Sequence, residues 1–132
     1  MGELDGNWIT ECFLTQGQGN TQSSMLTLLF DANSSVYTEY AYSDTNCSVP
    51  AIFPDTGAAV ENIVIEDTLS FPEESVSTPL GDAPFINFTN GPATRYSIYR
   101  ITDAQLYFGD GISDTPENRP TTIDEFFYYT RL

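Results

Sequence analysis

Apolar and polar residues alternate in short stretches along most of the chain. A period of two residues is typical of β-strands that bury one face, and no stretch shows the 3.6-residue period of an amphipathic helix. The stretches that alternate, or are short and apolar, are residues 7–14, 25–31, 36–43, 60–67, 85–89, 95–102, 105–109 and 125–132. The pattern therefore predicts about eight or nine short strands and an all-β fold.

Short polar segments separate these stretches. Turn-forming residues gather at 15–20, 32–35, 43–46 and 90–92, and 79–84 contains two prolines. Because proline cannot donate to a strand ladder, we expect a loop at 79–84. Turns every eight to twelve residues or so favour a small antiparallel up-and-down barrel, with a β-sandwich as the alternative. We expect all 132 residues to form one domain.

Three tyrosines are candidates for a binding pocket. Alternation in residues 36–43 places Tyr40 and Tyr42 on one face, and Tyr99 lies on a later predicted strand. Aromatic side chains with polar tips can line a pocket, although they can equally fill the interior of an eight-stranded barrel. We predict that Tyr40, Tyr42 and Tyr99 contact a ligand at the barrel mouth.

The charge balance excludes several partners. The chain has nineteen acidic residues and four arginines, with no lysine and no histidine, so its formal net charge is −15. Nucleic-acid binding needs cationic neutralisation of phosphates, and anionic membrane surfaces also attract cationic chains. We therefore expect no nucleic-acid partner. No apolar run is long enough to predict a membrane span.

Two cysteines, Cys12 and Cys47, predict a disulfide. Their number is even, the chain is small and β-rich, and neither their spacing nor the absent histidines suit a zinc site. A disulfide indicates an oxidising compartment, so we expect a secreted or periplasmic protein. On this interpretation the opening Met1 is an expression start that replaces a signal peptide or lipoprotein leader.

The usual catalytic residues are absent. Without histidine or lysine the chain lacks the common general base and the amine nucleophile, and it has no glycine-rich phosphate loop. Glu39, Glu61 and Glu66 could support carboxylate-only hydrolysis, but we interpret them as exposed acids. We therefore expect a non-enzyme with no catalytic residue and no cofactor.

The segment 109–114 has some features of a calcium site. Asp110 and Asp114 could supply oxygen ligands, but the middle acid and the late glutamate of a calcium loop are missing. An Asp-Gly turn is the simpler interpretation, so we expect no bound metal.

The sequence Gly6-Asn7-Trp8 resembles the G-x-W signature near the start of lipocalin-type barrels. In that family the tryptophan closes one end of the barrel, and an arginine of the last strand packs across its ring. The resemblance implies that Trp8 and Arg131 have these structural roles.

A longer pattern resembles a group of small secreted bacterial domains, periplasmic or lipoprotein-like, for which no activity is established. The matching stretches are residues 6–12, 42–47, 96–99, 106–110 and 119–124. The resemblance implies a calycin-like barrel with Cys12 paired to Cys47.

Three functional hypotheses follow. The first is a non-catalytic lipocalin-like module, expected to be monomeric, that binds a small apolar or amphipathic ligand. The second is a filled barrel that serves as a structural or protein-interaction domain of the cell envelope. The third is a carboxylate-only hydrolase.

Overall fold

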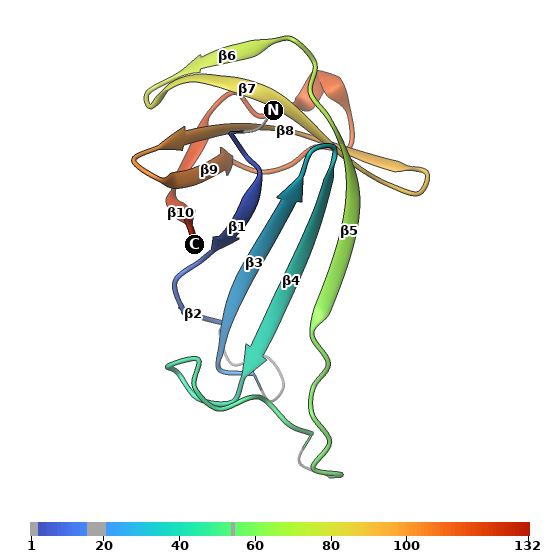
Figure 1. The fold of residues 1–132 in the computed structure, drawn as a ribbon, viewed down its shortest axis with the longest axis vertical. Helices are drawn as coiled ribbons and strands as arrows, with labels where there is room; N and C mark the ends of the chain where they lie inside the picture. The colour runs from blue at the N-terminus through green and yellow to red at the C-terminus, as the bar shows by residue number, and fades with distance from the viewer. Residues whose placement is uncertain (1–2, 16–20, 54) are drawn as a thin grey trace.

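The chain folds into ten β-strands and one short 3-10 helix, as a computed structural model shows for residues 3–15, 21–53 and 55–132 (Figure 1). Most of the turn predicted at 15–20 lies outside these residues. The elements are β1 (Gly6–Ile9), β2 (Phe13–Leu14), β3 (Ser23–Asp31), β4 (Ser34–Tyr42), β5 (Ile63–Ser70), β6 (Ser75–Thr78), β7 (Gly81–Asn90), β8 (Ala93–Thr102), β9 (Gln105–Gly109), η1 (Pro116–Asn118) and β10 (Ile123–Arg131).

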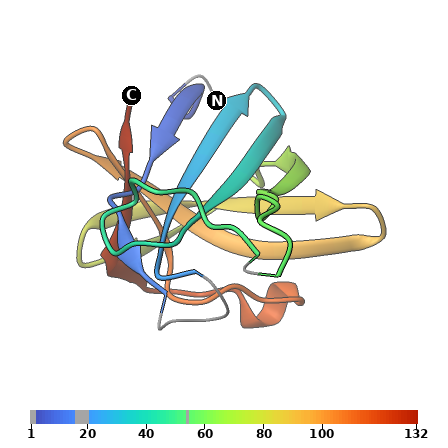
Figure 2. The ribbon, with the colours of Figure 1, turned by 90° about the horizontal axis from the view of Figure 1, so that it is seen from below.

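Eight of the strands close into an antiparallel barrel. Each of β3, β4, β5, β7, β8, β9 and β10 pairs with the next in this series, and β1 pairs with both β3 and β10. Figure 2 shows the β1–β3–β4 side crossing over β7 and β8, so that the sheet returns to its own first strand. The predicted all-β, up-and-down barrel is confirmed, and the sandwich is excluded.

The predicted strand 7–14 is divided into β1 and β2. Thr10 still exchanges hydrogen bonds with Leu26 of β3, through both its backbone amide and its side-chain oxygen (3.0 Å each). Glu11 and Cys12 then leave the ladder before β2 resumes pairing with β3. The interruption lies where Cys12 joins another part of the chain.

The predicted disulfide is confirmed. It joins Cys12 to Cys47, with the two Cα atoms 5.9 Å apart. Cys47 belongs to the turn that follows β4, so the bond ties the β1–β2 junction to the far end of the β3–β4 hairpin.

The loop predicted at 79–84 is wrong. Residues 75–78 and 81–84 instead form the hairpin of β6 with the start of β7, in which Ser75 lies opposite Pro84. Proline is tolerated at position 84 because the β7–β8 ladder begins only at Phe85. No backbone N–H is therefore needed from Pro84 on the side of β7 that faces β8.

The barrel interior is solidly packed around Trp8. The side chains there are almost completely buried, and they are Leu4, Trp8, Phe30, Ile86, Tyr99 and Leu106. A second cluster, Ala83, Ile98 and Ile123, is packed by Val76 of β6 and by Phe85.

Arg119 holds the 110–122 connection against the barrel. Its guanidinium carbon lies 4.2 Å from the centre of the Phe85 ring. Its Nη1 donates to the carbonyls of Ile86 and Ser97, at 3.2 and 2.7 Å. These bonds hold the connection against β7 and β8 of the barrel wall. No helix in the described part of the chain could cross a bilayer.

Candidate functional site

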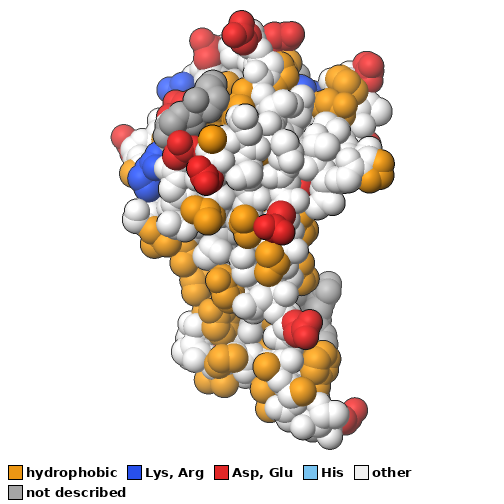
Figure 3. Space-filling view, turned by 45° about the vertical axis from the view of Figure 1, so that its right-hand side comes forward, with side chains coloured by type: hydrophobic (Ala, Val, Ile, Leu, Met, Phe, Trp, Pro, Cys, Tyr) orange, Lys and Arg blue, Asp and Glu red, His pale blue; other side chains and the backbone are white. Residues whose placement is uncertain are grey.

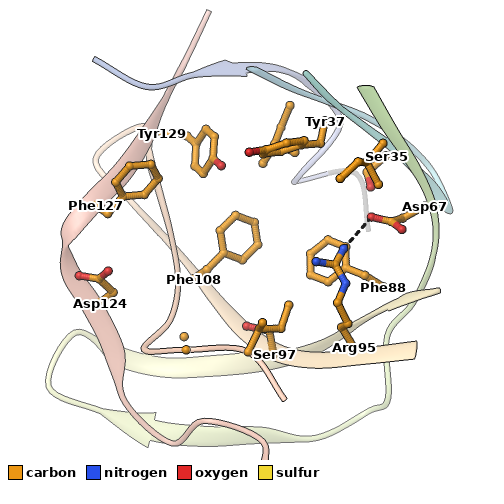
Figure 4. Close-up of a pocket in the computed structure, with 15 residues that line it drawn as sticks. Ser35, Tyr37, Asp67, Phe88, Arg95, Ser97, Phe108, Asp124, Phe127 and Tyr129 are labelled. Carbon is orange, nitrogen blue, oxygen red and sulfur yellow. Dashed lines mark hydrogen bonds and ion pairs between the residues drawn. The ribbon is translucent and has the colours of Figure 1, made fainter. Parts of the chain in front are cut away.

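An open cavity of about 420 Å³ lies in the barrel, and its rim includes exposed residues such as Ile112 (Figure 4). A volume of this size suits a small organic molecule. Strands β3, β4, β5, β7, β8, β9 and β10 and the 110–122 connection supply the lining residues, which are Leu28, Ser35, Tyr37, Ile65, Asp67, Phe88, Arg95, Ser97, Phe108, Gly109, Gly111, Ile112, Asp124, Phe127 and Tyr129.

Strand register brings two of the lining pairs together. Ser35 of β4 lies opposite Asp67 of β5, and Tyr37 lies opposite Ile65. Directly opposed residues of antiparallel strands project from the same face. The inward face of β4 therefore carries the odd-numbered positions, and these define one wall of the cavity.

An irregularity in β10 determines which of its side chains line the cavity wall opposite β4. The ladder with β9 shifts register between Ile123 and Tyr128, and Asp124 accepts a hydrogen bond from the amide of Phe126 at 3.1 Å. Asp124 and Phe127 both line the cavity although they are three residues apart, whereas Phe126 is 97% exposed. Residues 124–127 of β10 stand against a single residue of β9, and extra residues in a strand re-aim its side chains in this way.

The aromatic rings of the lining are in mutual contact. Phe108 lies between Phe88 and Tyr129, with ring centres 5.9 Å from each, and Tyr129 is 5.8 Å from Phe127. Figure 4 shows these rings and Tyr37 arranged around the same space. The cavity therefore has an aromatic wall rather than a purely aliphatic one.

One ion pair lies in the cavity wall. Arg95 Nη2 is 3.1 Å from Asp67 Oδ2, and the Asp67 side chain is only 4% exposed, against 39% for Arg95. The Arg95 guanidinium carbon also lies 5.7 Å from the centre of the Phe88 ring. Asp67 is thus the buried partner, whereas Arg95 extends toward the surface.

The phenols of the wall are kept protonated. Burial, followed by the hydrogen bond that Tyr37 donates to Glu39 (3.0 Å), raises the pKa of Tyr37 above its usual range. Burial, followed by the nearby Tyr37 and Glu39, raises the pKa of Tyr129 in the same direction. Figure 4 shows the Tyr129 hydroxyl directed toward the space between the rings, where it can hydrogen-bond to a ligand.

The predicted ligand residues do not line this cavity. Tyr40 and Tyr42 alternate with Tyr37 along β4, so they project from its opposite face. Tyr99 is buried in the packed end, where its hydroxyl donates to Glu3 at 2.8 Å. Alternation alone identified the two faces of β4 but could not tell which face turns inward.

Trp8 and Arg131 have the arrangement that the lipocalin resemblance implied. Trp8 is completely buried, and the guanidinium carbon of Arg131 lies 4.1 Å from the centre of its ring. Neither residue lines the cavity. They belong to the closed end of the barrel.

The acidic residues that the sequence offers for catalysis or metal binding are dispersed. Glu61 and Glu66 are exposed, and Glu39 is bonded to Tyr37. Asp110 and Asp114 are exposed in the 110–122 connection, and the described residues contain no group of three or more metal-ligating side chains. The carboxylates that do reach the cavity, Asp67 and Asp124, had no distinguishing sequence pattern.

Comparisons with protein-family models, curated proteins and solved structures returned no match to this chain.

Proposed function

We propose that this chain is a non-catalytic, lipocalin-like module that binds a small amphipathic molecule inside its barrel. The observation that carries the proposal is the 420 Å³ cavity, in which an aromatic wall surrounds a small number of polar groups. Binding sites for small molecules have this composition, because apolar surface supplies affinity and a few fixed polar atoms orient the ligand.

The proposed place of action is outside the cytoplasm, in a secreted or periplasmic setting. The Cys12–Cys47 disulfide supports this, because such bonds persist in oxidising compartments and are reduced in most cytosols.

Uptake of a neutral apolar dye tests the binding function. N-phenyl-1-naphthylamine, which fluoresces in apolar surroundings, should bind the wild-type chain. Ser97→Leu introduces a larger side chain into the cavity and should weaken dye binding by about ten-fold or more. Ser77→Leu makes the same change at an exposed position of β6 and should leave binding unchanged.

Two outcomes would count against the proposal. One is a wild-type chain that takes up no dye. The other is a folded Ser97→Leu variant, verified by near-ultraviolet circular dichroism, that binds as well as Ser77→Leu does.

A second candidate function, protein interaction in the cell envelope, is favoured by an exposed apolar surface. Figure 3 shows hydrophobic side chains gathered over the lower part of the molecule. Five large hydrophobic residues between 48% and 57% exposed belong to β5 and the connection before it, and they are Val49, Ile52, Phe53, Ile63 and Val64. Exposed apolar patches of this kind often mark contact sites.

The two candidates respond to different substitutions. If the apolar surface binds an envelope protein, the Ile63→Ser, Val64→Ser double variant should lose chemical cross-linking to envelope proteins and keep dye binding. Ser97→Leu should show the reverse pattern. Unchanged cross-linking in the double variant would remove this candidate.

A further inference from the structure

The most distinctive polar atom of the cavity is a buried carboxylate oxygen. Asp67 Oδ2 pairs with Arg95, but Oδ1 of the same group is buried and accepts no hydrogen bond from any residue that the structure describes. Buried acceptors are normally satisfied, so an unpaired oxygen in a cavity wall points to a donor that comes from outside the chain.

The position of Asp67 makes this oxygen available to a ligand. Asp67 lines the cavity, and Figure 4 shows its carboxylate directed inward above Arg95. The terminal torsion of an aspartate adopts a broad range of values. A small rotation therefore presents Oδ1 to the cavity while Oδ2 stays near the guanidinium.

The surrounding rings favour a cation at the same place. The rings of Tyr37, Phe88, Phe108, Phe127 and Tyr129 border the cavity, and the face of an aromatic ring attracts a positively charged group. The Tyr37 hydroxyl donates its own proton to Glu39, so its oxygen remains an acceptor.

The charges of the lining also favour a cation over an anion. Two carboxylates, Asp67 and Asp124, stand against the single guanidinium of Arg95, which Asp67 already neutralises. The whole chain carries a net charge of −15. A carboxylate ligand would have to compete with Asp67 for Arg95 in this negative field.

We infer that the cavity binds an organic amine, with its ammonium group donating to Asp67 Oδ1 and its apolar body lying among the aromatic rings. This inference rests on the proposed binding function and names the ligand class. It makes Asp67 the specificity-determining residue, because the aromatic wall alone accepts any apolar molecule.

Three probes with the same eight-carbon chain test the inference. Octylammonium, 1-octanol and octanoate are each titrated, at neutral pH, into the wild-type chain loaded with N-phenyl-1-naphthylamine. Octylammonium should displace the dye at a concentration about ten-fold lower than 1-octanol does, because it adds a charge-assisted hydrogen bond. Octanoate should be the weakest competitor.

A matched pair of variants assigns the preference to Asp67. Asp67→Asn keeps an oxygen for Arg95 but removes the charge, and it should reduce the amine-over-alcohol preference to about two-fold or less. Asp55→Asn removes the same charge from an exposed loop position and should keep the wild-type preference.

A fourth probe tests the hydrogen bond in the wild-type chain, so the result does not depend on the folding of a variant. Octyltrimethylammonium keeps the positive charge but has no N–H to donate, and it should compete less well than octylammonium. Equal competition by the two cations would overturn the assigned bond to Asp67 Oδ1.

The remaining outcomes separate this inference from the proposed function. If 1-octanol or octanoate competes as well as octylammonium, the amine assignment is overturned and the binding function stands. If the wild-type chain binds neither the dye nor any probe, both are overturned.

Discussion

Arg131 stacks on Trp8 across the seam that closes the barrel. The two residues are direct partners in the β1–β10 ladder, and the guanidinium carbon lies 4.1 Å from the ring centre. Arg131 also donates to the carbonyls of Glu3 and Asp5, at 2.5 and 2.9 Å, while the indole nitrogen of Trp8 donates to the carbonyl of Leu4 at 2.8 Å. The pair thus joins the first strand, the last strand and the segment before β1.

Trp8→Ala should strongly destabilise the chain. The indole is completely buried, so its removal should lower the free energy of unfolding by about 3 to 5 kcal/mol. Urea unfolding followed by circular dichroism measures the change. Phe126→Ala, which truncates a 97% exposed ring, should change it by about 0.5 kcal/mol or less. A similar small loss for Trp8→Ala would mean that the packed end does not depend on the indole.

The Cys12–Cys47 bond should account for a large part of the stability. It links residues 35 apart in the sequence, and in the chain-entropy model the loss of such a link lowers the free energy of unfolding by about 4 kcal/mol. The Cys12→Ser, Cys47→Ser variant should show this loss in urea unfolding and should not respond to reductant. Two thiols that are freely alkylated in unreduced protein from an oxidising compartment would contradict the prediction.

Three phenols that are partly or completely buried should make the fold sensitive to alkali. Burial raises the pKa values of Tyr37, Tyr99 and Tyr129, so the folded chain retains protons that the unfolded chain releases near its ordinary tyrosine pKa of about 10. Their contribution to stability is therefore fully present below about pH 10 and is lost as the pH rises above it.

Phenolate absorbance measures this effect. The phenols of Tyr37, Tyr99 and Tyr129 should ionise only together with unfolding, so part of the absorbance change of the folded chain should come at a higher pH than in urea. Identical titration curves for the folded and unfolded chains would show that the three phenols are not protected.

Gly109 should not tolerate a methyl group. A Cβ atom there would lie 2.9 Å from Cβ of Pro120 and 3.1 Å from Cγ1 of Ile98. Gly109→Ala should therefore lower the free energy of unfolding by about 1 to 3 kcal/mol. Pro120→Ala in the same chain should restore part of this loss, with a coupling of about 0.5 kcal/mol or more in a double-mutant cycle. If the two changes in the free energy of unfolding are strictly additive, the strain in Gly109→Ala does not come from contact with Pro120.

Much of the scaffold could be predicted from the sequence, because its signals are local. Alternation located strands such as β9 at its observed bounds and β3 to within two residues, and the number of strands with short turns favoured a barrel. The hairpin at 75–84 was missed because Pro84 predicts a strand break unless the neighbouring ladder is known to start after it.

The candidate site was beyond the sequence because it depends on how the strands are placed around the barrel. A two-residue period divides β4 into a Tyr37 face and a Tyr40 face without showing which one turns inward, and only pairing with β3 and β5 decides it. The register shift in β10 likewise turns Asp124 and Phe127 inward against simple alternation.

The sequence by itself determined the strand pattern, the even pair of cysteines and the negative charge, since each follows from residue type and local spacing. Tertiary structure alone decided that the barrel is packed around Trp8 and hollow beside Phe108. It also left Asp67 Oδ1 at that hollow without a donor among the residues that the structure describes. These features depend on side chains from strands far apart in the sequence, and they arise only when closure of the barrel brings those strands around one interior.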